Sequence, residues 1–350
     1  ETTRVSVNSN ETPANGDSFS PTLSADGRYV AFESDATNLV IGDSNGTDDV
    51  FIHDRVTGVT TRVSVSGGTQ ANDASDSPAL SADGRYVAFY SDATNLVTGD
   101  SNGTGDIFVH DRVTGVTTRV SVSGGTQAND ASDSPALSAD GRYVAFYSDA
   151  TNLVTGDTNG TGDIFIHNRE TGETTRVSVA DDVTEANGYS DSPALSADGR
   201  YVAFYSDATN LVTGGASGIG DIFVHDRETA GVTTRVSVAS NGTEADSASI
   251  LPTLSADGRY VAFTSFASNL DPGDTNGMFD IFVHDRVTVE TTRVSVASNG
   301  TEADFDSFSP TLSADGRYVT FESWASNLVT GDTNDAGDIF IVRTGITPGP

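Results

Sequence analysis

The sequence predicts an all-β protein: a six-bladed β-propeller with four antiparallel strands in each blade and an N-terminal strand that closes the last blade. Three observations predict it. One segment of just under sixty residues occurs six times, each copy contains four short strand-like stretches, and the chain begins with the fourth stretch of a copy and ends after the third. Repeats of this length are typical of propellers, solenoids and arrays, and four antiparallel strands per repeat are typical of a propeller blade.

Two motifs mark each repeat. The motif Ala-Asp-Gly-Arg-Tyr-Val has its aspartate at Asp26, Asp83, Asp140, Asp198, Asp257 and Asp315. The motif Thr-Thr-Arg-Val-Ser-Val has its arginine at Arg4, Arg62, Arg119, Arg176, Arg235 and Arg293. Residues that recur in this way belong to the scaffold, and we interpret arginines such as Arg55 and Arg62 as turn and ion-pair residues.

The second repeat shows the order of elements. We expect strands over Ser77–Leu80, Arg85–Tyr90, Asp106–Asp111 and Thr117–Val122. Asp-Gly at the first turn supplies the positive φ that a tight hairpin needs. A long polar loop, Ser91–Gly105, joins the second strand to the third.

The two ends of the chain predict how the ring closes. A lone fourth strand, Thr2–Val7, opens the sequence, and the sixth repeat stops after its third strand, Asp338–Val342. The N-terminal strand is therefore expected to complete the sixth blade, which gives one domain over residues 1–343. Residues 344–350 are expected to be a tail or a linker to further domains.

The repeated strings resemble a known family. Ser-Pro-x-Leu-Ser-Ala-Asp-Gly-Arg-Tyr-Val-Ala-Phe and Asp-Ile-Phe-Val-His-Asp-Arg-x-Thr-Gly are similar to the TolB-like, or WD40-like PD40, propeller repeat, over nearly the whole chain. The resemblance implies the fold. It implies little about function, because such propellers serve as interaction platforms, as lids on prolyl-peptidase-like enzymes and as parts of polysaccharide-active proteins.

Composition limits the partners. The formal net charge is −32, and all 18 basic residues are arginine. Such a surface repels nucleic acid and anionic membranes, and no apolar run is long enough to insert into a bilayer. The chain has no cysteine, and residue 1 already opens a strand-like stretch. We expect a secreted or cell-surface protein whose signal peptide has been removed; a cytoplasmic protein is the alternative.

The long loops predict calcium sites of the form Asp-x-Asn-x-x-x-Asp. Five repeats carry the pattern, at Asp43, Asn45 and Asp49; Asp100, Asn102 and Asp106; Asp157, Asn159 and Asp163; Asp274, Asn276 and Asp280; and Asp332, Asn334 and Asp338. Three oxygen-bearing side chains within seven residues suit a hard cation such as Ca²⁺. The alternative is that these residues form Asx-turns in a long loop.

The fourth repeat departs from the pattern, since Gly215 and Ser217 replace the first two ligands and leave only Asp221. We therefore expect about five structural Ca²⁺ ions and none in the fourth blade. No catalytic residue is predicted. One histidine per repeat in five repeats indicates a structural position, and no Gly-x-Ser-x-Gly elbow is present.

Function is expected where the repeats differ. Before the proline of the first strand, three repeats have an acid and three an apolar residue: Asp76, Asp133 and Asp191 against Phe19, Ile250 and Phe308. The end of the second strand shows the same division: Tyr90, Tyr147 and Tyr205 against Glu33, Thr264 and Glu322. One half of this face of the propeller is predicted to be acidic and the other half apolar.

Repeats five and six add large apolar residues in their loops. The predicted partner-binding patch consists of Phe266, Met278, Phe279, Phe305, Phe308 and Trp324. Exposed apolar patches on an acidic protein mark binding sites or subunit contacts. The alternative is that these side chains fold inward as small loop cores.

Three functions stay open. The first is a non-enzymatic extracellular calcium-binding propeller that contacts a protein, a second copy of itself or a glycan. The second is a polysaccharide-active enzyme that uses the acidic channel mouth, and the third is a structural repeat domain of a larger surface protein.

Overall fold

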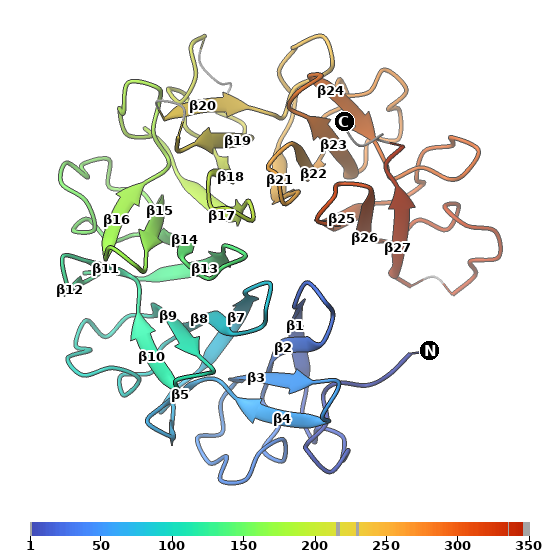
Figure 1. Ribbon diagram of the computed structural model, residues 1–350. Coiled ribbons are helices and arrows are strands. Elements are labelled where there is room, and N and C mark those ends of the chain that lie inside the picture. The colour runs from blue at the N-terminus through green and yellow to red at the C-terminus, as the bar shows by residue number, and fades with distance from the viewer. Residues whose placement is uncertain (1, 215–217, 229–230, 335, 346–350) are drawn as a thin grey trace. The chain divides into compact units, whose positions relative to one another are not determined.

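The computed structural model describes residues 2–214, 218–228, 231–334 and 336–345, and these residues form strands and loops without a helix. They build the six sheets of a six-bladed β-propeller, so the predicted fold class is confirmed (Figure 1). The chain divides into two compact units with three large sheets each, Glu1–Arg176 and Val177–Pro350, called here the N-terminal and the C-terminal unit. None of the described segments is a helix that could cross a membrane.

The N-terminal unit contains three four-stranded antiparallel meanders. The first sheet comprises β1 (Ser18–Leu23), β2 (Tyr29–Ser34), β3 (Asp49–Asp54) and β4 (Val59–Arg62). The second comprises β7 (Ser75–Leu80), β8 (Tyr86–Ser91), β9 (Asp106–Asp111) and β10 (Val116–Arg119), and the third β13 (Ser132–Leu137), β14 (Tyr143–Ser148), β15 (Asp163–Asn168) and β16 (Glu173–Arg176). Small hairpins β5 (Val65–Ser66)–β6 (Thr69–Gln70) and β11 (Val122–Ser123)–β12 (Thr126–Gln127) follow the first two sheets.

The C-terminal unit repeats the design. Its first two sheets comprise β17 (Ser190–Leu195), β18 (Tyr201–Ser206), β19 (Asp221–Asp226) and β20 (Val232–Arg235), and β21 (Ser249–Leu254), β22 (Tyr260–Ser265), β23 (Asp280–Asp285) and β24 (Glu290–Arg293). Its last sheet has three strands among the described residues, β25 (Ser307–Leu312), β26 (Tyr318–Ser323) and β27 (Asp338–Arg343).

Apolar side chains pack both within and between the sheets of a unit. Each of the six large sheets contains one stacked phenylalanine pair, such as Phe89–Phe108 with ring centroids 5.9 Å apart. Neighbouring sheets share a core. In the N-terminal unit Ile52 and Val63 of the first sheet pack with Phe89 of the second, and all three are essentially buried. Burial of such side chains is the main stabilising contribution to a stack of small sheets.

The Asp-Gly hairpins form as predicted and also join neighbouring sheets. At the second hairpin Gly84 has φ +71°, and its amide donates to the Ser81 carbonyl oxygen at 2.9 Å. A Cβ atom on Gly84 would lie 2.2 Å from Cδ2 of Tyr29 in the preceding sheet. Glycine is therefore required here both for the turn and for the close approach of the two sheets.

The predicted first, second and third strands are confirmed, with boundaries shifted by one or two residues. The fourth strand is shorter than predicted: in the second repeat it ends at Arg119, because the chain then turns into the β11–β12 hairpin. The expected N-terminal strand is not formed, since Thr2–Ser6 have no ladder partner and Val7 makes one isolated bridge to Pro13. Completion of the last blade by residues 1–7, and the single domain over 1–343, stay predictions; most of the tail lies outside the described residues.

The repeated histidines lie inside the sheets. His53, for example, is buried, and its Nδ1 shares a hydrogen bond of 2.9 Å with Oγ1 of Thr60 on the adjacent strand. Burial lowers the pKa of His225 and His284 to about 4, so these imidazoles are neutral at pH 7. This environment fits the structural position that the repeat pattern predicts.

Candidate functional site: arginine centres and an aromatic row

The predicted calcium ligands of the first loop come together around an arginine. Nη1 of Arg62, from β4, lies 3.4 Å from Oδ1 of Asp43 and 3.2 Å from Oδ2 of Asp49. The Arg62 side chain is 9% exposed and the Asp49 side chain is fully buried. Gln70 Nε2 donates to both carboxylates, at 2.8 Å to Asp43 and 3.0 Å to Asp49. We call such a group, an arginine of the fourth strand with the loop carboxylates, an arginine centre.

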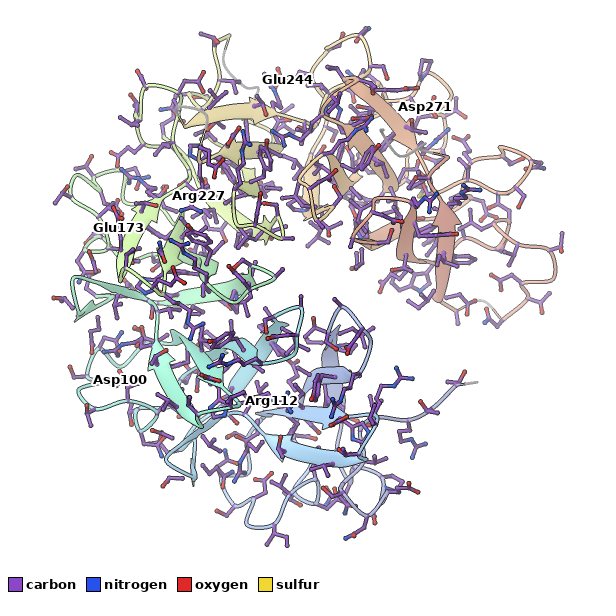
Figure 2. The ribbon with its side chains drawn as sticks, viewed as in Figure 1. Asp100, Arg112, Glu173, Arg227, Glu244 and Asp271 are labelled. Atoms are coloured by element: carbon purple, nitrogen blue, oxygen red, sulfur yellow. The ribbon has the colours of Figure 1, made fainter. Side chains whose placement is uncertain are left out.

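The same centre recurs in the other four-stranded sheets. Its ion pairs are Arg119 with Asp100 and Asp106, Arg176 with Asp157 and Asp163, Arg235 with Asp221 and Glu244, and Arg293 with Asp274 and Asp280 (Asp100 and Glu244 are labelled in Figure 2). The repeated arginine is thus an ion-pair residue, as predicted, and its partners are the residues that the sequence assigned to calcium.

The fourth centre has an acid that the sequence reasoning missed. Glu244 Oε1 lies 2.5 Å from Nη1 of Arg235, which also contacts Asp221 at 3.3 Å. Gly215 and Ser217, on which the prediction of an ion-free fourth loop rests, lie outside the described residues. Glu244 restores the second carboxylate that the fourth loop pattern lacks. A signal for it was available, since Gln70 occupies the matching place of the first repeat.

As arranged, the centres do not fit a calcium ion. A guanidinium already lies between the two carboxylates, and Asn45 turns its amide N–H, not its oxygen, toward Asp49 at 3.4 Å. Ser64 Oγ donates to the other Asp49 oxygen at 2.5 Å. Across the described residues, no three or more histidine, cysteine or acidic side chains are grouped to hold a metal. The five Ca²⁺ ions stay a prediction from the sequence.

The fifth centre carries an excess of negative charge. Four carboxylates surround Arg293: Asp271 at 3.1 Å, Asp274 at 3.4 Å, Asp280 at 3.2 Å and Glu302 at 3.0 Å. The Arg293 side chain is only 4% exposed. Burial, and next the charge of Asp280, raises the pKa of Asp274 to about 6. One arginine therefore does not fully compensate the acids of this loop.

The raised pKa of Asp274 predicts a pH dependence of stability. The pKa of Asp274 in the folded state, about 6, lies above its ordinary value of 3.8. Protonation of this carboxyl group therefore stabilises the folded state. The protonated Asp274 contributes fully to the free energy of unfolding below about pH 4, and this contribution is lost as the pH rises through 6. After allowance for partial exposure, we expect a loss of about 1 kcal/mol.

Urea unfolding of the Asp274→Asn variant between pH 4 and 7 measures this loss. The variant should decline less with pH than the wild-type protein, because its amide does not titrate. Asp17→Asn, at an exposed position of the N-terminal unit, is the matched control and should follow the wild-type curve. Parallel curves for Asp274→Asn and wild type would contradict the prediction.

Four of the six predicted partner-binding residues form a continuous aromatic row in the C-terminal unit. The ring centroids of Phe266 and Phe279 are 5.1 Å apart, those of Phe279 and Phe308 5.0 Å, and those of Phe308 and Trp324 6.3 Å. Phe266 is 43% exposed and Trp324 46% exposed. The rings thus pack on one another without being buried, which combines the two alternatives that the sequence left open.

Hydrogen bonds between the loops hold the backbone that carries the aromatic row. Phe266 and Trp324 directly follow β22 and β26, and Phe279 directly precedes β23. The Phe279 amide donates to Oδ1 of Asp306 at 2.9 Å, and the Trp324 amide to the Asp306 carbonyl at 3.1 Å. Asp306 therefore fixes the backbone on both sides of the Phe308 ring.

The other two predicted residues lie outside the row. Phe305 is 49% exposed, and no ring contact joins it to the row among the described residues. Met278 is half-buried, with its amide held by Oδ1 of Asn276 at 2.8 Å. Both residues are therefore close to the row in sequence without being part of it.

The N-terminal unit shows a different arrangement at the same repeat positions. Tyr90 Oη donates to Asp92 at 2.7 Å, and Tyr147 Oη to Asp149 at 2.5 Å. Burial, and after it the charges of Glu33 and Asp133, raises the pKa of Asp76 to about 6. The aspartates of these two pairs occupy the repeat positions that Phe266 and Trp324 occupy in the last two sheets of the C-terminal unit.

The chain is similar in fold to several proteins of known structure. No family model and no curated protein sequence matches the chain. Similar solved structures include the β-propeller domain of the Trilobed protease from Pyrococcus furiosus, with 11% identity, TM-score 0.56 and coverage of 95% of this chain and 84% of that one. The acylaminoacyl peptidase from Pyrococcus horikoshii has 11% identity, TM-score 0.53 and coverage of 93% and 44%. TolB from Acinetobacter baumannii has 18% identity, TM-score 0.47 and coverage of 80% and 58%.

These likenesses are of fold. The chain spans 58% of that TolB and 44% of that peptidase, so neither protein's activity follows for it. The fold by itself does not decide whether the chain is an enzyme, because one fold can carry many unrelated functions.

Proposed function

We propose that the chain is a binding module and that the aromatic row of the C-terminal unit, Phe266, Phe279, Phe308 and Trp324, is its contact surface. The observation that carries the proposal is the row itself. Rings that contact one another at 5.0–6.3 Å, with their outer members more than two fifths exposed, are pre-ordered and still accessible. Clustered tryptophan and aromatic side chains of this kind supply most of the binding energy in protein interfaces.

The charges around the row favour a basic protein partner. Asp306 lies beside Phe279, and Glu322 lies opposite Phe308 in the register of β25 and β26. The net charge of −32 adds long-range attraction for cations and opposes association with a second copy. An arginine or lysine beside an apolar side chain would contact both a carboxylate and a ring face.

We retain the proposal of a secreted or cell-surface location, which rests on the sequence alone.

Selection of a random peptide library on the immobilised protein tests the proposal. We expect enrichment of peptides that carry arginine or lysine next to aromatic or aliphatic residues, and weaker binding at high salt. A glycan array and sedimentation velocity are run in parallel. Enrichment without basic residues, glycan binding alone, or self-association through the row would each overturn the basic-protein assignment.

A further inference from the structure

Six asparagines begin the tripeptide Asn-x-Thr, in which x is never proline: Asn10, Asn45, Asn102, Asn159, Asn241 and Asn299. The amide nitrogen of this tripeptide is the acceptor of N-linked glycans, and such an acceptor lies on an accessible surface segment. The six tripeptides occur in the long loops between the second and third strands and in the turns that precede the first strand of a repeat. These two environments differ in what the amide nitrogen contacts.

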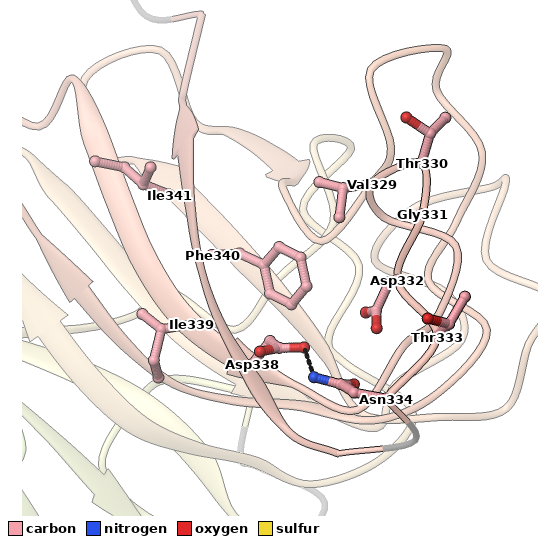
Figure 3. Close-up of a pocket in the computed structure, with 10 residues that line it drawn as sticks. All are labelled: Val329, Thr330, Gly331, Asp332, Thr333, Asn334, Asp338, Ile339, Phe340 and Ile341. Carbon is pink, nitrogen blue, oxygen red and sulfur yellow. Dashed lines mark hydrogen bonds between the residues drawn. The ribbon is translucent and has the colours of Figure 1, made fainter.

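In the long loops the asparagine amide is engaged inside the protein. Nδ2 of Asn102 donates to Oδ2 of Asp106 at 3.3 Å and to the Ala128 carbonyl oxygen at 3.1 Å. The first loop contains the same two contacts. Figure 3 shows the sixth loop, where Nδ2 of Asn334 donates to Asp338 at 3.1 Å. A glycan on a nitrogen held in this way would require the loop to open.

The turns of the C-terminal unit leave the amide nitrogen accessible. In residues 239–243 the Ala239 amide donates to the Thr243 carbonyl oxygen and the Gly242 amide to the Ala239 carbonyl oxygen, each at 2.8 Å. Oδ1 of Asn241 accepts from the Thr243 amide at 2.9 Å. Asn241 is exposed and borders a cavity of about 330 Å³. Apart from chain neighbours, no described atom lies within 4 Å of where a Cβ on Gly242 would be, so the tip has room for a bulky group.

The next turn of the unit, residues 297–301, repeats this geometry. The Ala297 amide donates to the Thr301 carbonyl oxygen and the Gly300 amide to the Ala297 carbonyl oxygen, each at 2.8 Å. Oδ1 of Asn299, which is exposed, accepts from the Thr301 amide at 3.0 Å. Within the described part of the chain, Nδ2 of Asn241 and of Asn299 donates no hydrogen bond. The nitrogen that would carry a glycan is therefore available at both tips.

The turn itself does not require an asparagine. Asp182 occupies the matching place in the turn before β17, and its Oδ1 accepts from the Thr184 amide at 3.0 Å. A carboxylate thus makes the same turn without an amide nitrogen. What the two asparagines add is a nitrogen at the tip that the fold does not use.

We propose that Asn241 and Asn299 are acceptor sites for N-linked glycans. Nδ2 attacks C1 of a glycosyl diphosphate, a sugar joined through C1 to a lipid or nucleoside diphosphate. The C1–N bond forms, the bond from C1 to the diphosphate oxygen breaks, the diphosphate leaves with the electron pair, and a base of the transferase takes one amide proton. Asn10 is not included, because the Thr12 amide donates instead to Oδ1 of Asn8, at 3.0 Å.

Glucosyl transfer to the purified, folded full chain tests the proposal independently of the aromatic row and of the proposed location. The chain is incubated with UDP-glucose and a soluble glycosyltransferase that acts on Asn-x-Thr, and mass spectrometry maps the modified peptides. We expect glucose on Asn241 and Asn299. Modification of Asn102 should be slower by about tenfold or more, because its amide reacts only from a locally opened loop. A synthetic peptide of residues 97–108 should be modified readily, which attributes the protection of Asn102 to the fold.

Two variants sharpen the test. Thr243→Ala should abolish the modification of Asn241 and leave that of Asn299, the internal control. Asp182→Asn creates Asn-Val-Thr in the matching turn and should gain a third modified site. Absence of glucose from Asn241 and Asn299 while the peptide is modified would overturn the proposal, and so would equal rates at Asn102 and Asn241 in the folded chain.

Discussion

Replacing Arg293 with methionine is expected to lower the free energy of unfolding of the C-terminal unit by about 3–5 kcal/mol. The Arg293 side chain is 4% exposed and faces four carboxylates at 3.0–3.4 Å. Removing the guanidinium leaves these acids partly buried without a counter-charge, which costs more than the ion pairs themselves contribute. Part of the loss should return at pH 4, where protonation relieves the repulsion.

Urea unfolding followed by the fluorescence of Trp324, the one tryptophan of the chain, measures this effect in the unit that contains it. Arg317→Met is the matched control: its side chain is 42% exposed and should change the free energy by less than about 0.5 kcal/mol. Arg62→Met should fall between the two, since Gln70 continues to donate to both carboxylates of that centre. Similar values for Arg293→Met and Arg317→Met would show that the arginine centre contributes nothing to stability.

Replacing Phe279 and Trp324 together with serine is expected to weaken the binding of the selected peptides at least about 100-fold. Phe279 contacts the rings of both Phe266 and Phe308, and Trp324 ends the row at Phe308. The double substitution therefore removes two rings and the support of the other two. The carboxylates of Asp306 and Glu322 remain, so the residual binding should be weak and sensitive to salt.

Isothermal titration calorimetry with one selected peptide measures the affinity, and circular dichroism verifies that the variant is folded. The control Val113→Ser/Val116→Ser removes two exposed apolar side chains, 75% and 53% exposed, from the N-terminal unit. It should bind like the wild type. Phe266→Ser, at the exposed end of the row, should give a smaller loss of affinity. This single variant tests the same surface if the double variant does not fold. Unchanged affinity in a folded double variant would contradict the proposed surface.

The fold could be predicted from the sequence because each signal recurs six times. Asp-Gly turns, apolar third strands such as Asp106–Asp111 and the phenylalanines of the core are local features, and repetition averages out their individual ambiguity. The short fourth strand was not predictable from its apolar pattern, since the β11–β12 hairpin competes for the same residues. Nor was the bulge at Ser77, a non-glycine residue with φ 51° in β7, where the register with β8 shifts.

The arginine centres show what a residue pattern within one loop cannot predict. Asp43, Asn45 and Asp49 have the spacing of a cation site, and the structure does bring them together. They also contact a guanidinium, that of Arg62, which is 13 residues further along the chain than Asp49. Only the pairing of β3 with β4 brings it to the loop. A spacing rule that counts ligands within one loop cannot detect a charge that arrives from the next strand.

The position of the aromatic row could be predicted by comparing the repeats, but the exposure of its rings could not. The exchange of aspartate for Phe266 and Trp324 is visible in the sequence, but whether the rings point inward depends on the backbone contacts of Asp306. The structure gives a row in which Phe279 and Phe308 are half-buried and Trp324 is 46% exposed.

Thermal unfolding with about 10 mM Ca²⁺ and with excess EGTA tests the arginine centres most directly, because about 10 mM is roughly ten times the dissociation constant of the weakest extracellular calcium modules. If arginine takes the place of the cation, the unfolding midpoint should be the same in both conditions, since no ion bound to the native state is removed. Isothermal titration with Ca²⁺ should show no saturable heat. A midpoint that rises with Ca²⁺ in the wild type and not in Asp280→Asn would contradict the account and would restore calcium as the ligand of these loops.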